Sequence, residues 1–328
     1  MELYNNYWKL IKEEIPSKGK FYSPNAVIKI RPLNVQEVKY LSTLNPQNST
    51  DVINEIVEKC TIFKNMEFED LLLADREYLI FWLRANSFQK NNGYELNLIC
   101  DKCGENYQQS VHLAEFPVEL YDDKKAERDI YLPDCGLKVR LKHPTMKDLS
   151  RTNEDPVIEN FMRHLDVGAT NEQLEMLLTR LSAMDYNILK NNVDEMFIGF
   201  SRKVASVCPK CGDVKYYNIE LTDNGLFGIV NIGDVLETIL RICKYTNYQI
   251  PESAPWWEVE TQQVIVNKMI EEEKQEMDRH EEEGRGVPPE GHKGLFRIRQ
   301  TDLDTGAAEE KTDLLRTDRG KFRIRQGL

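Results

Sequence analysis

Apolar residues in the first ninety positions recur mainly at helical spacing, after an opening stretch that lacks such a period. We expect residues 1–32 to form an extended N-terminal arm and residues 33–92 to form a helical segment. Asn34 is placed to cap the first helix, and Glu37 stands where it would complete a capping box. Ser49 or Thr50 is expected to cap the second helix, and a third helix is expected from about residue 67 to about residue 88.

The period then changes to strict alternation on both sides of two cysteine pairs, which predicts a strand, a tight turn and a strand in each case. These two units cover residues 93–116 and 203–222. Between them, residues 117–202 form an insertion with its own pattern: a hairpin of strands 128–132 and 137–141, followed by helices. The helices predicted in the insertion cover about residues 156–165, 171–184 and 191–202.

Residues 223–283 again show helical spacing, and the segment ends in the charge run 271–283, which is typical of a solvated helix end. The tail, residues 284–328, has the composition of a linker and contains a repeat: Phe296-Arg-Ile-Arg-Gln300 recurs as Phe322-Arg-Ile-Arg-Gln326. The predicted fold class is therefore α+β, mainly helical, with a split four-cysteine zinc ribbon, a small β-hairpin insertion and an extended C-terminal tail.

Composition and charge narrow the classes of function. The chain of 328 residues carries 43 Lys and Arg against 55 Asp and Glu, a formal net charge of −12. Such a balance disfavours general adhesion to nucleic acid or anionic lipid. No stretch approaches the roughly 20 apolar residues that span a bilayer, and the N-terminus lacks the apolar core of a signal peptide. We therefore expect a soluble protein without a membrane partner.

Four of the seven cysteines form two matched turns, which carry the candidate chemistry. A structural Zn²⁺ needs four ligands in a tetrahedron, and each Cys-x-x-Cys turn supplies two sulfurs. In both turns a lysine precedes the second cysteine and a glycine follows it, and a positive φ at that glycine would let the turn close. The predicted ligands of one structural Zn²⁺ per chain are Cys100, Cys103, Cys208 and Cys211, flanked by Lys102, Lys210, Gly104 and Gly212.

The other interpretations of these cysteines fit less well. A redox pair sits at a helix N-terminus, whereas here a glycine and a strand follow each pair. A catalytic zinc keeps an open position and usually has His or carboxylate ligands. The sequence also holds no nucleophile elbow, phosphate-binding loop or His-Glu-x-x-His motif, so we predict no enzyme and no small-molecule substrate. The cysteines at 60, 135 and 243 and the single histidines lack metal spacing.

Several segments resemble a known family. They are 15–22 (Ile-Pro-Ser-Lys-Gly-Lys-Phe-Tyr), 28–33 (Ile-Lys-Ile-Arg-Pro-Leu), 72–79 (Leu-Leu-Ala-Asp-Arg-Glu-Tyr-Leu) and 82–87 (Trp-Leu-Arg-Ala-Asn-Ser). In this order, leading into the first cysteine pair, they resemble the T4-type bacteriophage baseplate hub protein family over about the first 225 residues. The segment from residue 245 to 258 is similar to a short helical element that follows related zinc modules in contractile-tail assembly proteins.

The resemblance implies a non-enzymatic part of a contractile tail baseplate, in its hub or wedge region, made in the host cytoplasm and located in the virion. Its partners would be other baseplate or tail proteins, in a symmetric ring. An assembly chaperone absent from the mature virion is the alternative, and a zinc-ribbon protein that binds nucleic acid is a further one. The residues hypothesised to bind partners are Phe296, Ile298, Phe322, Ile324, Trp256 and Trp257, the first four on one face of strands that the tail could add to neighbouring sheets.

Overall fold

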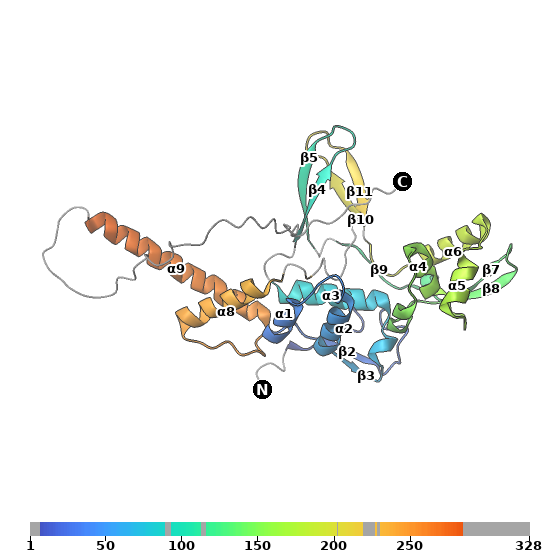
Figure 1. The fold of residues 1–328 in the computed structure, drawn as a ribbon, viewed down its shortest axis with the longest axis horizontal. Helices are drawn as coiled ribbons and strands as arrows, with labels where there is room; N and C mark the ends of the chain where they lie inside the picture. The colour runs from blue at the N-terminus through green and yellow to red at the C-terminus, as the bar shows by residue number, and fades with distance from the viewer. Residues whose placement is uncertain are drawn as a thin grey trace, which may run out of the picture.

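The computed structural model describes residues 7–88, 93–112, 116–201, 203–218, 227 and 230–284. Figure 1 shows a central body of helices from which three parts project in different directions: a pair of hairpins, a helical module and a long helix. The fold is α+β, with several small sheets among its helices. None of the helices in the described part of the chain combines the length and apolar character that a bilayer crossing needs.

The body begins with a three-stranded antiparallel sheet in the order β1-β2-β3. Residues expected to lie in an arm take part in it and in the core, where Ile11, Ile15 and Ile28 are fully buried. Asn34 and Glu37 form the predicted capping box at the first helix. Ser49 is the first residue of the second helix rather than its cap. The elements are β1 (Lys9–Leu10), β2 (Val27–Ile30), α1 (Val35–Leu41), α2 (Ser49–Cys60), β3 (Thr61–Lys64) and α3 (Leu73–Ser87).

The single helix expected over residues 67–88 is wrong. A 3-10 turn, η2 (Phe68–Asp70), comes first, and the backbone at Leu71 and Leu72 is extended before α3 begins. The N–H of Leu72 donates to the Tyr22 hydroxyl at 3.0 Å, and Leu72 also forms an antiparallel bridge with Thr145. Partners distant in the sequence therefore hold this segment out of the helix.

Two antiparallel hairpins carry the cysteine turns at their tips, and together they are called the ribbon below. The first pairs all seven residues of each strand, from Gly93 opposite His112 to Ile99 opposite Asn106. The second runs from Lys203 opposite Asn218 to Val207 opposite Val214. The strands are β4 (Gly93–Ile99), β5 (Asn106–His112), β10 (Lys203–Val207) and β11 (Val214–Asn218).

The insertion between the hairpins has a hydrophobic core of its own, separate from that of the body. Its hairpin has the predicted bounds, and Gly136 takes a positive φ of 64° in the turn. The helix expected over 191–202 is misplaced, because Ser182 caps a helix that ends at Glu195. The elements are β7 (Arg128–Leu132), β8 (Leu137–Leu141), α4 (Pro156–His164), α5 (Asn171–Leu178) and α6 (Ala183–Glu195).

The two ends of the insertion meet at the body. β6 (Val118–Glu119) pairs with β9 (Gly199–Phe200), so the chain leaves and returns at one place. There the Phe200 ring stacks on Phe81 of α3, with centroids 4.0 Å apart and an interplanar angle of 21°. This contact joins the base of the insertion to α3 in the body.

Two helices complete the described chain: α8 (Ile232–Thr246) and α9 (Trp256–Gly284). The start of α9 is hydrogen-bonded to the start of α1, since Trp256 N donates to Leu33 O at 2.9 Å and Val35 N donates to Ala254 O at 3.0 Å. α9 packs along α8 and then extends past it (Figure 1). The described side chains of its distal half, through His280, are exposed.

Candidate metal centre

The first cysteine turn closes directly after β4. Gly104 N donates to Cys100 O at 2.8 Å, and Cys100 N donates to Glu105 O at 2.9 Å, so two backbone bonds shape the turn. Gly104 has a φ of +70°, which an L side chain rarely adopts. The positive φ expected from the sequence is thus confirmed, and it lets both thiols point the same way.

The second turn repeats this geometry. Gly212 N donates to Cys208 O and Cys208 N donates to Asp213 O, both at 2.9 Å, and Gly212 has a φ of +71°. The same backbone bonds form at the same positions because both turns have the sequence Cys-x-Lys-Cys-Gly followed by an acid. The two turns are therefore local copies of one structure, placed about 105 residues apart in the chain.

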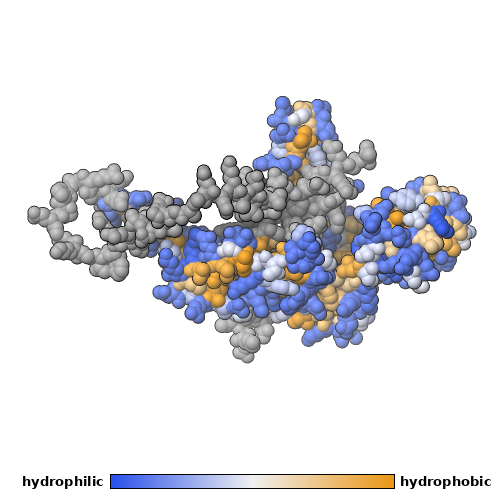
Figure 2. Space-filling model, in the orientation of Figure 1, coloured by the Kyte–Doolittle hydropathy of each residue, from blue (hydrophilic) through white to orange (hydrophobic). Residues whose placement is uncertain are grey.

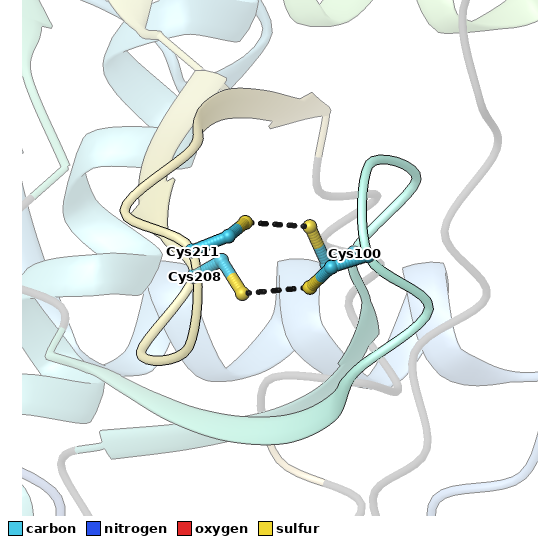
Figure 3. Close-up of side chains that lie close together, drawn as sticks. Cys100, Cys208 and Cys211 are labelled. Atoms are coloured by element: carbon cyan, nitrogen blue, oxygen red, sulfur yellow. Dashed lines mark hydrogen bonds between the residues drawn. The ribbon is translucent and has the colours of Figure 1, made fainter.

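The four thiols converge on one point. Cys100 Sγ lies 3.6 Å from Cys211 Sγ, and Cys103 Sγ lies 3.7 Å from Cys208 Sγ. All four sulfurs are within 4.8 Å of one another, and Figure 3 shows the thiols of the two loops facing each other. A tetrahedron with Zn–S bonds of about 2.3 Å has S···S edges of about 3.8 Å. The donor set and its spacing fit a four-coordinate thiophilic ion.

Contacts between the inner faces of the hairpins hold the two turns at this distance. The hydroxyls of Tyr107 and Ser206 lie 2.8 Å apart, and Gln109 Nε2 donates to Ala205 O at 3.2 Å. Apolar side chains fill the space between the sheets, where they exclude water and align the tips. Apart from the cysteines, the buried apolar side chains of the ribbon that the structure describes are Leu96, Leu98, Val111, Val204 and Tyr217.

Charged side chains cross from each turn to the other. Lys102 Nζ lies 3.5 Å from Asp213 Oδ1, and Lys210 Nζ lies 2.8 Å from Glu105 Oε2. A third pair joins Lys215 to Asp101. Four thiolates around a divalent ion leave a net charge near −2, which nearby lysines offset. The two lysines were predicted, but Glu105 and Asp213 were missed, although the acid after each glycine extends the sequence repeat by one residue.

Backbone N–H groups of its own turn favour the ionised form of the Cys208 thiol. Its pKa is lowered to about 7, chiefly because the N–H of Cys211 donates to the sulfur, with further help from the N–H of Lys210 and against the effect of desolvation. Metal ions bind the thiolate rather than the thiol. A thiol that ionises near neutral pH is suited to be the first ligand.

The remaining cysteines lie elsewhere. Cys60 is fully buried in the body core, and this burial raises the pKa of its thiol. Cys135 lies in the turn of the insertion hairpin, where a hydrogen bond to Asp185 raises its pKa. Cys243 is half-buried on α8. Among the residues that the structure describes, the four ribbon cysteines are the one group of three or more Cys, His, Asp or Glu side chains that could share an ion.

Of the residues hypothesised to bind partners, the structure describes Trp256 and Trp257. Trp256 is only 6% exposed and belongs to the body core, so contact with another protein would require it to leave that core. Trp257 is half-buried and packs edge-on against Tyr7, with ring centroids 5.8 Å apart. The tail residues Phe296, Ile298, Phe322 and Ile324 lie outside the described residues, and their role stays a prediction.

Comparison with known proteins adds one match. A family whose description is T4 bacteriophage base plate protein matches residues 9–225. The matched region contains most of the body, the whole insertion and both cysteine turns, and it ends before α8. No curated protein and no solved structure shows a significant match to the chain.

Proposed function

Since the chain belongs to the T4 bacteriophage base plate protein family, we propose that it is a zinc-stabilised structural component of the hub or wedge region of a contractile tail baseplate, where it binds neighbouring subunits. The observation that carries this proposal is the match over residues 9–225, which spans both halves of the ribbon. Membership of this family implies a place in the phage tail.

Zinc is the ion we propose for the ribbon, one per chain. Four cysteine thiolates at tetrahedral spacing are the usual ligand set of structural Zn²⁺. Cys100, Cys103, Cys208 and Cys211 would hold the ion, whose contribution is a cross-link between two hairpins that are far apart in the sequence. Because the body and the insertion are both covalently joined to these hairpins, the cross-link would fix both at the base of the ribbon.

The proposed role includes no catalysis. Four thiolates fill the coordination shell of Zn²⁺ and leave no position for a substrate or a reactive water. Rigidity is the property that such a site provides, and a subunit of a mechanical assembly requires it. We propose other baseplate or tail proteins, arranged in a symmetric ring, as the binding partners.

An assembly chaperone that leaves before the virion is complete is the second candidate function. Mass spectrometry of purified virions beside purified tail intermediates separates the two. The structural role predicts stoichiometric peptides of this chain in both samples. Peptides found only in the intermediates would contradict the structural role and establish the chaperone.

The tail repeat supports a further part of the proposal, namely that residues 284–328 attach the chain to neighbouring subunits. The two Phe-Arg-Ile-Arg-Gln copies would present Phe296, Ile298, Phe322 and Ile324 to exposed sheet edges, and two linked sites would gain avidity. Deleting residues 284–328 should reduce incorporation into baseplates while the thermal unfolding of the remaining chain stays unchanged. Normal incorporation of the deletion variant would refute this attachment.

A further inference from the structure

The two hairpins of the ribbon have the same fold but different outer faces. Inward-facing and outward-facing residues alternate along each strand, so the outer face of β10 and β11 is formed by Lys203, Ala205, Val207, Val214 and Tyr216. Three of these are large apolar side chains that remain exposed: Val207 at 58%, Val214 at 57% and Tyr216 at 69%. Figure 2 shows apolar surface on the projecting ribbon.

The outer face of the first hairpin is mostly polar. It carries Asn97 and Gln108, joined by a 3.0 Å hydrogen bond, together with the exposed residues Asn106 and Ser110. Ile99, next to the cysteine turn, is its one large apolar residue among those with described side chains. Since this hairpin folds with amides on its outer face, the apolar side chains of the second hairpin are not needed for the ribbon to form.

Helix α9 has an exposed face that also carries apolar side chains next to charged ones. Gln263 and Asn267 of α9 hydrogen-bond to Thr238 and Arg241 of α8. Residues two positions further along a helix lie about 200° around its axis, so Ile265 and Met269 point away from α8. Both are exposed. Further along the same face, at helical spacing, lie the exposed acids Glu272 and Glu276.

We propose that the outer face of β10 and β11 binds this face of α9 in a second copy of the chain. Each face carries a small apolar set, three residues on the ribbon and two on the helix, and each set ends in charge of the opposite sign: Lys203 on the ribbon, Glu272 and Glu276 on the helix. The spacings also agree, since alternate strand residues are about 6.6 Å apart and helix residues four positions apart are about 6 Å apart. This complementarity is the reason for assigning the occupant to a second copy.

The two faces belong to separate projections of the molecule (Figure 1), so the proposed contact joins different surfaces of the two copies. Such head-to-tail contacts repeat from copy to copy and close into a ring when the rotation permits. The apolar area is small, so the contact should be weak and dependent on concentration. The inference goes beyond the proposed function, because self-association does not depend on whether the chain stays in the virion.

The test uses the full-length chain with zinc bound, in sedimentation velocity from low to high micromolar concentration. We expect the mass-average sedimentation coefficient to rise with concentration. In the variant Val207→Thr, Val214→Thr, Tyr216→Gln the association should weaken at least about tenfold, while the zinc content and circular dichroism are retained. Asn97→Ala with Gln108→Ala, on the sister hairpin, is the matched control and should associate as the wild type does.

Charge reversal identifies the partner face. Lys203→Glu alone and Glu272→Lys with Glu276→Lys alone should each weaken association, and an equimolar mixture of the two variants should restore it, since alternating copies then present opposite charges at every contact. A monomer at all concentrations would overturn the proposal. Association that survives the ribbon substitutions would overturn it too, as would a mixture that associates no better than the separate variants.

Discussion

Lys210 in the second cysteine turn contacts Glu105, the acid that follows the first turn, with Nζ 2.8 Å from Oε2. Lys102 contacts Asp213 in the reciprocal arrangement. Lys210 is 61% exposed and Glu105 38% exposed, so water screens the pair and its contribution to stability is small. We predict that Lys210→Glu increases zinc loss to a chelator by no more than about fivefold and that adding Glu105→Lys reverses the effect.

The control for this exchange is Lys138→Glu, which breaks a pair with Asp129 in the insertion hairpin, away from the cysteine turns. It should leave the rate of zinc loss unchanged. If Lys210→Glu and Lys138→Glu affect zinc loss equally, the charges that cross between the turns have no specific role at the metal centre.

Removing a ligand from each turn should remove the ion. We predict that the protein purifies with about one zinc per chain and that Cys100→Ser combined with Cys208→Ser lowers this to near zero. Because metal binding and folding are coupled, hydrogen exchange should accelerate in residues 93–112 and 203–218. Elemental analysis and exchange mass spectrometry measure both effects.

Cys243→Ser is the matched control, because this thiol is half-buried on α8 and lies outside the cysteine cluster. Its zinc content should equal that of the wild type. Wild-type protein that is metal-free and stably folded would contradict the assignment of a structural ion.

Features encoded by neighbouring residues were predictable from the sequence. The capping box of Asn34 and Glu37 depends on two residues three positions apart, and the insertion hairpin depends on alternation around one turn that contains Gly136. The convergence of the four cysteines was predictable because each turn is complete within five residues, and repetition of Cys-x-Lys-Cys-Gly pointed to a shared site. Both turns could be recognised without knowing how the roughly 100 residues between them fold.

Features that depend on distant partners could not be predicted. The interruption before α3 contains no glycine or proline and exists because Tyr22 and Thr145 bind the backbone at Leu72. β6 and β9 have two residues each, too few to show any period. The role of residues 11–22 in the core was missed because Ile11 and Ile15 are buried from turns and bends rather than from a regular element.

Glycines with a positive φ should differ in their tolerance of alanine. At Gly104 an added Cβ would meet no atom within 4 Å. Gly104→Ala should therefore lower the free energy of unfolding by only about 1 kcal/mol, which is the cost of holding an L residue in the left-handed conformation. Gly199 has a φ of +116°, and its Cβ would lie 3.4 Å from the Cβ of Ala74. Gly199→Ala should therefore cost about 2 kcal/mol or more, as measured by urea unfolding. Equal costs would show that the base of the insertion adapts freely.

Asp75 should make stability depend on pH. Its side chain is fully buried, and desolvation raises its pKa to about 6, although hydrogen bonds from Ser17 N and the Tyr22 hydroxyl act in the opposite direction. The unfolded carboxyl ionises near pH 4, so the folded state holds the proton more tightly. Stability from this group is greatest below pH 4 and falls by about 3 kcal/mol as the pH rises from 4 through 6 and above.

The free energy of unfolding of Asp75→Asn should lack this decrease, whatever its absolute value, because the amide does not titrate. Chemical denaturation at pH 4, 5, 6 and 7 measures the difference in slope between the variant and the wild type. Asp129→Asn, at an exposed site of the insertion hairpin, is the control and should keep the wild-type decrease. If the free energy of unfolding of Asp75→Asn decreases with pH as that of the wild type does, the buried carboxyl of the wild type stays ionised over this whole pH range.

The separate core of the insertion should allow it to unfold without the body. Phe161 is buried in the insertion core, whereas Phe200 is buried in the body core, where it stacks on Phe81.

Truncating a buried phenylalanine to alanine lowers the free energy of unfolding by about 3–5 kcal/mol. We predict that Phe161→Ala accelerates hydrogen exchange in α4, α5 and α6 while β4, β5, β10 and β11 keep their protection. Phe200→Ala should accelerate exchange in α3 as well, because its ring contacts that helix. If Phe161→Ala instead exposes the ribbon and α3 to the same extent as the insertion, the two cores unfold as one cooperative unit.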